Sequence, residues 1–162
     1  MAAPDGVSPD SAGVVPFHLW PPVAMGIPLV AGALLTWLAG DPFTLGGWRV
    51  PLGWGLVAVF ALWNGWALVL FQRHRTGLLP GQATRTIMSS GPFAVSRNPL
   101  YVGMLALYVG LALLIPSAWA LLATPIAAGL VLWGAILPEE KFLSREFGSE
   151  YDDYARRVRR WL

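Results

Sequence analysis

Residues 98–140 read NPLYVGMLALYVGLALLIPSAWALLATPIAAGLVLWGAILPEE. This stretch holds two apolar runs, Pro99–Ile115 and Ser117–Leu137, with no Asp, Glu, Lys or Arg in either. At a rise of about 1.5 Å per residue, roughly 20 apolar residues cross a bilayer core about 30 Å thick. Because so little chain separates the runs, we expect two membrane-spanning helices folded back as a tight hairpin. Such a hairpin returns the two ends of the stretch to the same membrane face.

Two further apolar stretches, Leu19–Ala39 and Leu52–Phe71, precede the hairpin. The chain is 56% hydrophobic and 12% charged, with a mean hydropathy of +0.56, whereas soluble domains are about 25% charged. We therefore expect an all-α protein, an integral membrane bundle of about four transmembrane helices with a C-terminal interfacial helical tail. Residues 1–18 lack the basic start of a signal peptide. They are predicted to form a flexible tail before a single domain over residues 19–162.

The basic residues are distributed unevenly along this topology. Arg49 lies between the first two apolar stretches. With four spans, all the other Lys and Arg residues fall on the side that carries both termini: Arg73, Arg75, Arg85, Arg97, Lys141, Arg145, Arg156, Arg157, Arg159 and Arg160. Loops rich in Lys and Arg stay in the cytoplasm. We therefore expect a multi-pass protein with both termini, and the charged face, in the cytoplasm.

Several functional classes are disfavoured by composition and motif content. The chain has no cysteine and a net charge of only +2, which argues against disulfides, thiol chemistry and a nucleic-acid partner. His18 and His74 are isolated in the sequence, so no metal site is expected. No dinucleotide-binding glycine turn, P-loop or nucleophile elbow occurs. A transporter is disfavoured because the four apolar stretches contain no Asp, Glu, Lys or Arg.

A polar motif stands at the entrance of the hairpin. Residues 90–103 read SGPFAVSRNPLYVG. Pro99 suits the first turn of a helix, and Asn98 is then predicted as the N-cap, with N–H groups behind it that can bind an anion. Arg97 adds a fixed positive charge. A simpler interpretation is a capped membrane helix with one arginine that reaches the headgroups, and the motif alone does not separate the two.

Glu139 and Glu140 follow the hairpin directly. Two adjacent carboxylates at a membrane boundary repel each other and lose hydration, so they need a nearby cation. Arg97 is one candidate and a positively charged ligand is another, while a solvated helix end is the simpler alternative. Acids at a helix C-terminus oppose the helix dipole, which slightly favours a functional role.

The segment after the glutamates is predicted to form two short interfacial helices. Gly148 is the expected stop between them, and Ser149 the expected cap of the second. In the second helix an apolar and aromatic stripe opposes a basic face, which we expect to rest on anionic headgroups. The stripe consists of Tyr151, Tyr154, Val158 and Trp161, and the basic face of Arg156, Arg157, Arg159 and Arg160.

Together these motifs resemble the membrane methyltransferase superfamily of isoprenylcysteine carboxyl methyltransferases and phospholipid N-methyltransferases. The shared pattern is S-G-P-F-x-x-x-R-N-P-x-Y-x-G, a helical hairpin, E-E, and F-G-x-x-Y-x-x-Y-x-x-x-V-x-R, over roughly half the chain. The resemblance implies an S-adenosylmethionine-dependent methyltransferase with S-adenosylhomocysteine as its product. Its cofactor-binding half would be residues 84–162, and a small lipophilic acceptor or membrane lipid would enter from the bilayer.

The resemblance also implies roles for individual residues. The cofactor contacts that it implies are Thr86, Ile87, Met88, Ser89, Phe93, Asn98, Pro99, Leu100, Tyr101 and Glu139. Asn98 to Tyr101 would hold the methionine part, and Glu139 the ammonium group or the ribose. Glu140 and Arg97 are the candidate catalytic residues, with Glu140 as the hypothetical base for an amine acceptor. Methyl transfer from a sulfonium depends mainly on positioning and needs no metal.

Two departures from the prenylcysteine enzymes bear on the acceptor. Those enzymes resemble this pattern but have His in place of Asn98, and an Arg, thought to meet the substrate carboxylate, in place of Ala135. These differences favour an amine acceptor of phospholipid type over a prenylcysteine carboxylate. The alternative is a non-catalytic lipid-binding or scaffold protein that retains the fold. The acceptor, the number of methyl groups transferred and the oligomeric state are left open by the sequence.

Overall fold

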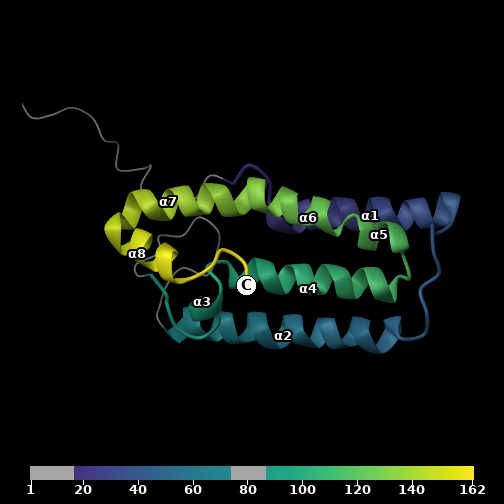
Figure 1. The fold of residues 1–162 in the computed structure, drawn as a ribbon, viewed down its shortest axis with the longest axis horizontal. Helices are drawn as coiled ribbons and strands as arrows, with labels where there is room; N and C mark the ends of the chain where they lie inside the picture. Colours follow the sequence, from purple (N-terminus) through teal and green to yellow (C-terminus); the bar gives the residue numbers. More distant parts are fainter. Residues whose placement is uncertain (1–16, 74–86) are drawn as a thin grey trace, which may run out of the picture.

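The computed structural model describes residues 17–73 and 87–162, most of which are helical (Figure 1). The described residues contain no β-strand, only an isolated bridge between Ser96 and Arg159. The predicted all-α class is therefore confirmed. The elements are α1 (Pro21–Ala39), α2 (Arg49–Arg73), α3 (Pro92–Val95), α4 (Pro99–Leu114), α5 (Ala118–Leu122), α6 (Thr124–Val131), the π-helical turn η2 (Leu132–Ile136), α7 (Leu137–Phe147) and α8 (Ser149–Arg157).

The long helices run along one axis and lie in tiers (Figure 1). α4 lies between α2 on one side and α5 and α6 on the other, and α1 packs against α5 and α6. α2 and α4 approach closely because glycines line their contact. A Cβ atom added to Gly110 would lie 2.9 Å from the carbonyl oxygen of Gly53. Small residues permit this close packing between membrane helices.

Three of the four predicted apolar stretches form single helices. α1 and α2 are each long and apolar enough to cross a membrane, whereas α4 is shorter, with 16 residues. The fourth stretch is helical but interrupted, because α5 ends at Leu122 and α6 restarts with Thr124 and Pro125. Proline has no N–H to continue the helical hydrogen bonds. Large apolar side chains such as Trp37, 80% exposed, and Leu62, 76% exposed, cover the outer faces of α1 and α2.

The hairpin of α4 with α5 and α6 forms as the sequence predicts. Ser117 caps α5, because its Oγ accepts a hydrogen bond from the Ala120 N–H at 3.0 Å. The Tyr108 hydroxyl donates to the Ala120 carbonyl at 2.8 Å and ties the two arms together. The buried core lies between α1, α4 and α6. It consists of Ala24, Met25, Tyr108, Ala127, Val131 and Ile136.

The π-helical turn η2 joins the hairpin to α7. Its Gly134 carbonyl accepts hydrogen bonds from the His18 N–H at 2.9 Å and the Leu19 N–H at 3.2 Å. A Cβ atom at Gly134 would lie 2.7 Å from the Cβ of Leu19, so glycine gives the segment before α1 room to dock there. A π turn inserts an extra residue into a helix and is frequent at functional sites. This one sets the rotation of α7, which begins just before Glu139.

The C-terminal region confirms one prediction and corrects two. α7 and α8 are separated at Gly148, whose φ of +54° suits a glycine, as predicted. Ser149 is not the cap, because it is the first residue of α8 and no side chain caps that helix. α8 ends at Arg157, so Val158 and Trp161 do not continue its helical stripe. The segment 158–162 instead runs beside Ser96.

Some predictions fall on residues that the structure does not describe. These residues are 1–16 of the predicted flexible tail, Arg75 and Arg85 of the predicted charged face, and the predicted cofactor contact Thr86. His18, at the predicted end of that tail, contacts the π turn, and its ring stacks on Trp133 with centroids 5.2 Å apart. The domain boundary at residue 18 stays a prediction.

Candidate functional site

A small pocket of about 50 Å³ lies where α4 begins and α7 begins. The hairpin brings its two sides together, since one wall comes from the segment before α4 and the other from the helix after η2. Every lining residue is among those that the sequence singled out: Phe93, Arg97, Asn98, Pro99, Leu100, Tyr101 and Glu139. Asn98 and Glu139, far apart in sequence, therefore face one small space.

Glu139 is connected to α4 by a hydrogen bond. The Tyr101 hydroxyl, in the first turn of α4, donates to Glu139 Oε2 at 2.9 Å. Burial raises the pKa of the Glu139 carboxyl, the Tyr101 hydrogen bond lowers it, and the neighbouring charge of Glu140 raises it, with a net increase. An inward-facing carboxyl with a raised pKa gains from a cationic partner, so the pocket is suited to a positively charged ligand group.

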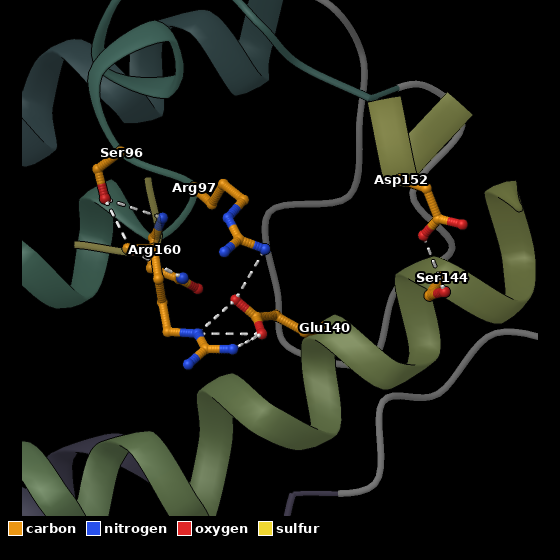
Figure 2. Close-up of polar contacts among 7 residues, drawn as sticks. Ser96, Arg97, Glu140, Ser144, Asp152 and Arg160 are labelled. Carbon is orange, nitrogen blue, oxygen red and sulfur yellow. Dashed lines mark hydrogen bonds and ion pairs between the residues drawn. The ribbon is translucent and has the colours of Figure 1, made fainter. Parts of the chain in front are cut away.

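Glu140 lies between two arginines (Figure 2). Arg160 makes a bidentate contact, with its Nε 2.9 Å from Glu140 Oε1 and its Nη2 2.8 Å from Oε2. Arg97 approaches from the other side, with Nη1 3.3 Å from Oε1. The Glu140 side chain is only 12% exposed and is not among the residues that line the pocket. Its acceptor capacity is largely taken up by the two guanidinium groups.

The C-terminal segment is attached to the entrance of α4 through its backbone. The Arg97 N–H donates to the Arg159 carbonyl at 2.8 Å, and the Ser96 hydroxyl donates to the Arg160 carbonyl at 3.2 Å. The Asn98 side-chain amide also donates to the Arg160 carbonyl, at 3.1 Å. Asn98 occupies the N-cap position of α4 as predicted, but its side chain does not cap the helix. The prediction that the Arg160 side chain rests on headgroups was wrong, because it pairs with Glu140.

The short helix α3 is held under α8. Gly91, with φ of +59°, turns the chain into α3, and the Tyr154 hydroxyl donates to the Phe93 carbonyl at 2.7 Å. Burial raises the pKa of Tyr154 above its ordinary value. Of the predicted contacts before α3, Ile87 and Met88 are half-buried, Ser89 is exposed, and none lines the pocket beside Glu139.

The comparison with protein families decides what kind of protein carries this site. A family model described as phospholipid methyltransferase matches residues 48–150. The chain belongs to the phospholipid methyltransferase family. The match includes α2, the hairpin and both glutamates, so it covers the elements that build the pocket. This membership and the two long apolar helices together indicate a membrane protein.

Two curated relatives of this phospholipid methyltransferase family member carry names from metal resistance. The nickel-cobalt-cadmium resistance protein NccN of Alcaligenes xylosoxydans xylosoxydans is 32% identical over 123 residues, which cover 76% of this chain and 50% of the relative. The cobalt-zinc-cadmium resistance protein CzcN of Cupriavidus metallidurans is 31% identical, with the same coverage. The chain thus spans about half the length of the curated relatives it matches. No solved structure matches it.

No metal centre is evident in the part of the chain that the structure describes. Across residues 17–73 and 87–162, no three His, Asp or Glu side chains are grouped so that they could hold an ion.

Sequence reasoning missed a second cavity, which lies between α1, α2 and α4. It has a volume of about 490 Å³ and an almost entirely apolar lining, and Leu100 belongs to the walls of both this cavity and the pocket. One sequence feature pointed to this region: Asn64 is a polar residue in the middle of the apolar helix α2. Its Nδ2 donates a hydrogen bond to the Leu100 carbonyl at 3.3 Å. The lining residues are Pro22, Met25, Gly26, Leu29, Phe60, Asn64, Leu68, Leu100, Met104, Leu107, Tyr108 and Leu111.

Proposed function

We propose that this protein is an S-adenosylmethionine-dependent methyltransferase that acts on a membrane lipid or a small lipophilic acceptor. The observation that carries the proposal is the pocket in which Asn98 and Tyr101 of one hairpin arm meet Glu139 of the other. Family membership supports methyl transfer as the reaction. The apolar cavity supports a lipophilic acceptor, because Leu100 lines both this cavity and the pocket.

The side chains of the pocket fit one end of this cofactor. S-adenosylmethionine has an ammonium and a carboxylate at its amino-acid end, and when bound it supplies an electrophilic methyl group on a positively charged sulfur. Glu139 would hold the ammonium group. Arg97 would meet the carboxylate, since its Nε is buried and has no hydrogen-bond partner among the described residues. A volume of about 50 Å³ suits such an end and not a whole ligand, which needs roughly 300 Å³ or more.

We propose that the acceptor places its apolar part in the cavity between α1, α2 and α4. The cavity volume of about 490 Å³ lies within the usual range for ligand sites of roughly 300–1,000 Å³. Ala135, where prenylcysteine enzymes have an Arg, is fully buried within η2. The position therefore offers no cation for a carboxylate acceptor, which supports an amine acceptor of phospholipid type.

The two glutamates would then have different roles. Glu139 faces the pocket, whereas Glu140 is paired with Arg97 and Arg160. Protonation of Glu140 would weaken both ion pairs, so we propose that it anchors Arg97 and does not act as the base suggested by the sequence. A pH–rate profile of Glu140→Gln tests this assignment. A strongly lowered rate together with loss of the acidic limb would restore Glu140 as the base, whereas an unchanged pH profile would remove it from that role.

The proposed location of the site is the cytoplasmic membrane face. α3, α8 and the start of α4 lie toward one end of the bundle, and the segment between α1 and α2 lies at the other (Figure 1). The pocket belongs to the first end, because its lining comes from α3, the start of α4 and the start of α7. Among the residues that the structure describes, every Lys and Arg except Arg49 belongs to the helix ends and segments at the first end. The positive-inside rule supports a multi-pass protein with this end inside the cell.

Methyl transfer is tested with purified protein, bacterial lipid extract and cofactor radiolabelled on the methyl group. We expect label in a lipid band, and we expect Glu139→Gln to abolish it while Glu146→Gln, an exposed acid on the same helix, does not. Calorimetry with S-adenosylhomocysteine reports cofactor binding separately. Binding without labelling of any lipid would support the non-catalytic alternative, and absence of both would refute the proposal.

A further inference from the structure

Arg160 contacts both arms of the site through different atoms. Its carbonyl accepts hydrogen bonds from the Ser96 hydroxyl at 3.2 Å and the Asn98 amide at 3.1 Å, at the entrance of α4. Its guanidinium group holds Glu140 on α7 through three contacts of 2.8 to 3.1 Å. The residue therefore bridges the two segments that the hairpin brings together. Figure 2 shows it beside Ser96 on one side and Glu140 on the other.

The contacts between Arg160 and Glu140 also affect how far Glu140 occupies the hydrogen-bond donors of Arg97. Glu140 lies between the two arginines, but Arg160 makes the bidentate contact and Arg97 only one approach of 3.3 Å. The Arg97 side chain is 15% exposed and lines the pocket, and its Nε has no partner among the described residues. The Arg97 side chain also hydrogen-bonds Tyr151 of α8. Because Arg160 makes the closer contacts with Glu140, the Arg97 Nε–H is left as a donor for a ligand.

We propose that Arg160 is a positioning residue of the methyltransferase site. It neutralises Glu140 and fixes the Asn98 amide, so that Arg97 and Asn98 face the amino-acid end of the bound cofactor in a set geometry. This inference rests on the proposed function. It gives Arg160 a role that differs from the other arginines near the C-terminal end, since Arg156, Arg157 and Arg159 are exposed.

Arg159 provides the matched control for this role. Its side chain is exposed, and it serves the site only through its carbonyl, which accepts from the Arg97 N–H. Arg159→Met therefore removes the same charge one residue away and leaves every backbone contact possible. Arg160→Met removes the contact with Glu140, and Arg160→Lys keeps the charge but loses the planar two-point geometry of the guanidinium group.

The first readout is the affinity for S-adenosylhomocysteine, measured by calorimetry on the full chain in detergent or nanodiscs. We expect Arg160→Met to weaken binding about ten-fold or more, as expected for loss of charge-assisted hydrogen bonds. Arg160→Lys should lie between Arg160→Met and the wild type, and Arg159→Met should bind as the wild type does. Equal affinities of Arg160→Met and Arg159→Met would overturn the proposal.

The second readout is the pH dependence of that affinity, which a purely structural role would not move. Glu139 must be ionised to hold an ammonium group. The groups that face it are Tyr101 of α4, Glu140 of its own helix, Tyr151 of α8, and Arg97, which lines the same pocket. Without Arg160, the charge of Glu140 is less compensated and disfavours ionisation of Glu139 more strongly. The midpoint of binding should therefore move to higher pH in Arg160→Met and stay in place in Arg159→Met.

The double variant Glu140→Gln with Arg160→Met separates positioning from failure to fold. If Arg160→Met unfolds because an uncompensated carboxylate is left inside, the double variant should regain the folded state. We expect it to fold and still bind S-adenosylhomocysteine more weakly than the wild type. Full affinity in the folded double variant would overturn the positioning role of Arg160 and leave the proposed function standing. A wild-type protein that neither binds S-adenosylhomocysteine nor transfers methyl groups would refute the proposed function itself.

Discussion

Glu139 and Glu140 are neighbours in sequence, yet the fold gives them different surroundings. Glu139 has a neutral donor, the Tyr101 hydroxyl, and faces the pocket, while Glu140 has two guanidinium groups and faces the C-terminal segment. Consecutive residues on a helix point about 100° apart, so the two carboxylates meet different elements. From the sequence one could predict that the two glutamates need a nearby cation. Which of the two would pair with the arginines could not be predicted.

The raised pKa of Glu139 gives a prediction for stability against pH. A carboxyl whose folded-state pKa is raised holds a proton that the unfolded chain releases, so stability falls as pH rises from about pH 4 through the folded-state pKa. Glu139→Gln should remove this fall, because glutamine stays neutral. Thermal unfolding in detergent from about pH 4 to about pH 8 measures it. The exposed acid replaced in Glu146→Gln serves as control, and a wild-type slope in Glu139→Gln would contradict the assignment.

At the scale of single elements, the hairpin could be predicted and its irregularities could not. The apolar runs and the lack of a loop between them are sufficient to predict two packed arms. The π turn at Leu132–Ile136 is uniformly apolar, so the spacing of its apolar residues does not differ from that of an ordinary helix. Its extra residue is therefore visible only in the structure. α8 ends at Arg157 because the segment after it pairs with Ser96, a contact too distant in sequence to be predicted.

The π turn predicts a strong effect of a small substitution. Ala at Gly134 would place its Cβ 2.7 Å from the Cβ of Leu19 and 3.3 Å from the Leu19 carbonyl oxygen. The chain before α1 would have to shift, at a cost of about 1–3 kcal/mol. Gly129→Ala in α6 is the matched control, because nothing lies within 4 Å of its added Cβ. Thermal unfolding should separate the two variants, and equal melting temperatures would refute the packing argument.

At the scale of the whole molecule, the uneven distribution of charge is matched by the arrangement of the helices. The helices that correspond to the predicted spans run along the long axis of the bundle (Figure 1). Several of the predicted site residues line one pocket: Phe93, Arg97, Asn98, Pro99, Leu100, Tyr101 and Glu139. The apolar cavity was not predicted, because it is formed by residues of α1, α2 and α4 that have no distinctive pattern in sequence. Periodicity shows which residues are apolar, but only packing shows where they leave a space.

The orientation of the bundle is open to a direct test, because the chain contains no cysteine and single cysteines can be introduced without background. Gly47→Cys places a thiol in the exposed turn between α1 and α2, and Glu146→Cys places one near the end of α7. In intact cells, a membrane-impermeant maleimide should label Gly47→Cys only, and both variants after lysis. Labelling of Glu146→Cys in intact cells would reverse the proposed orientation.

The central claim is that two distant motifs form one cofactor site, and photo-crosslinking of tritiated S-adenosylmethionine followed by peptide mapping tests it most directly. We predict label on peptides that contain residues 93–101 and 137–147, competed by unlabelled S-adenosylhomocysteine and lost in Glu139→Gln. Label confined to peptides from α1 or from the turn before α2, or unaffected by the competitor, would contradict the account.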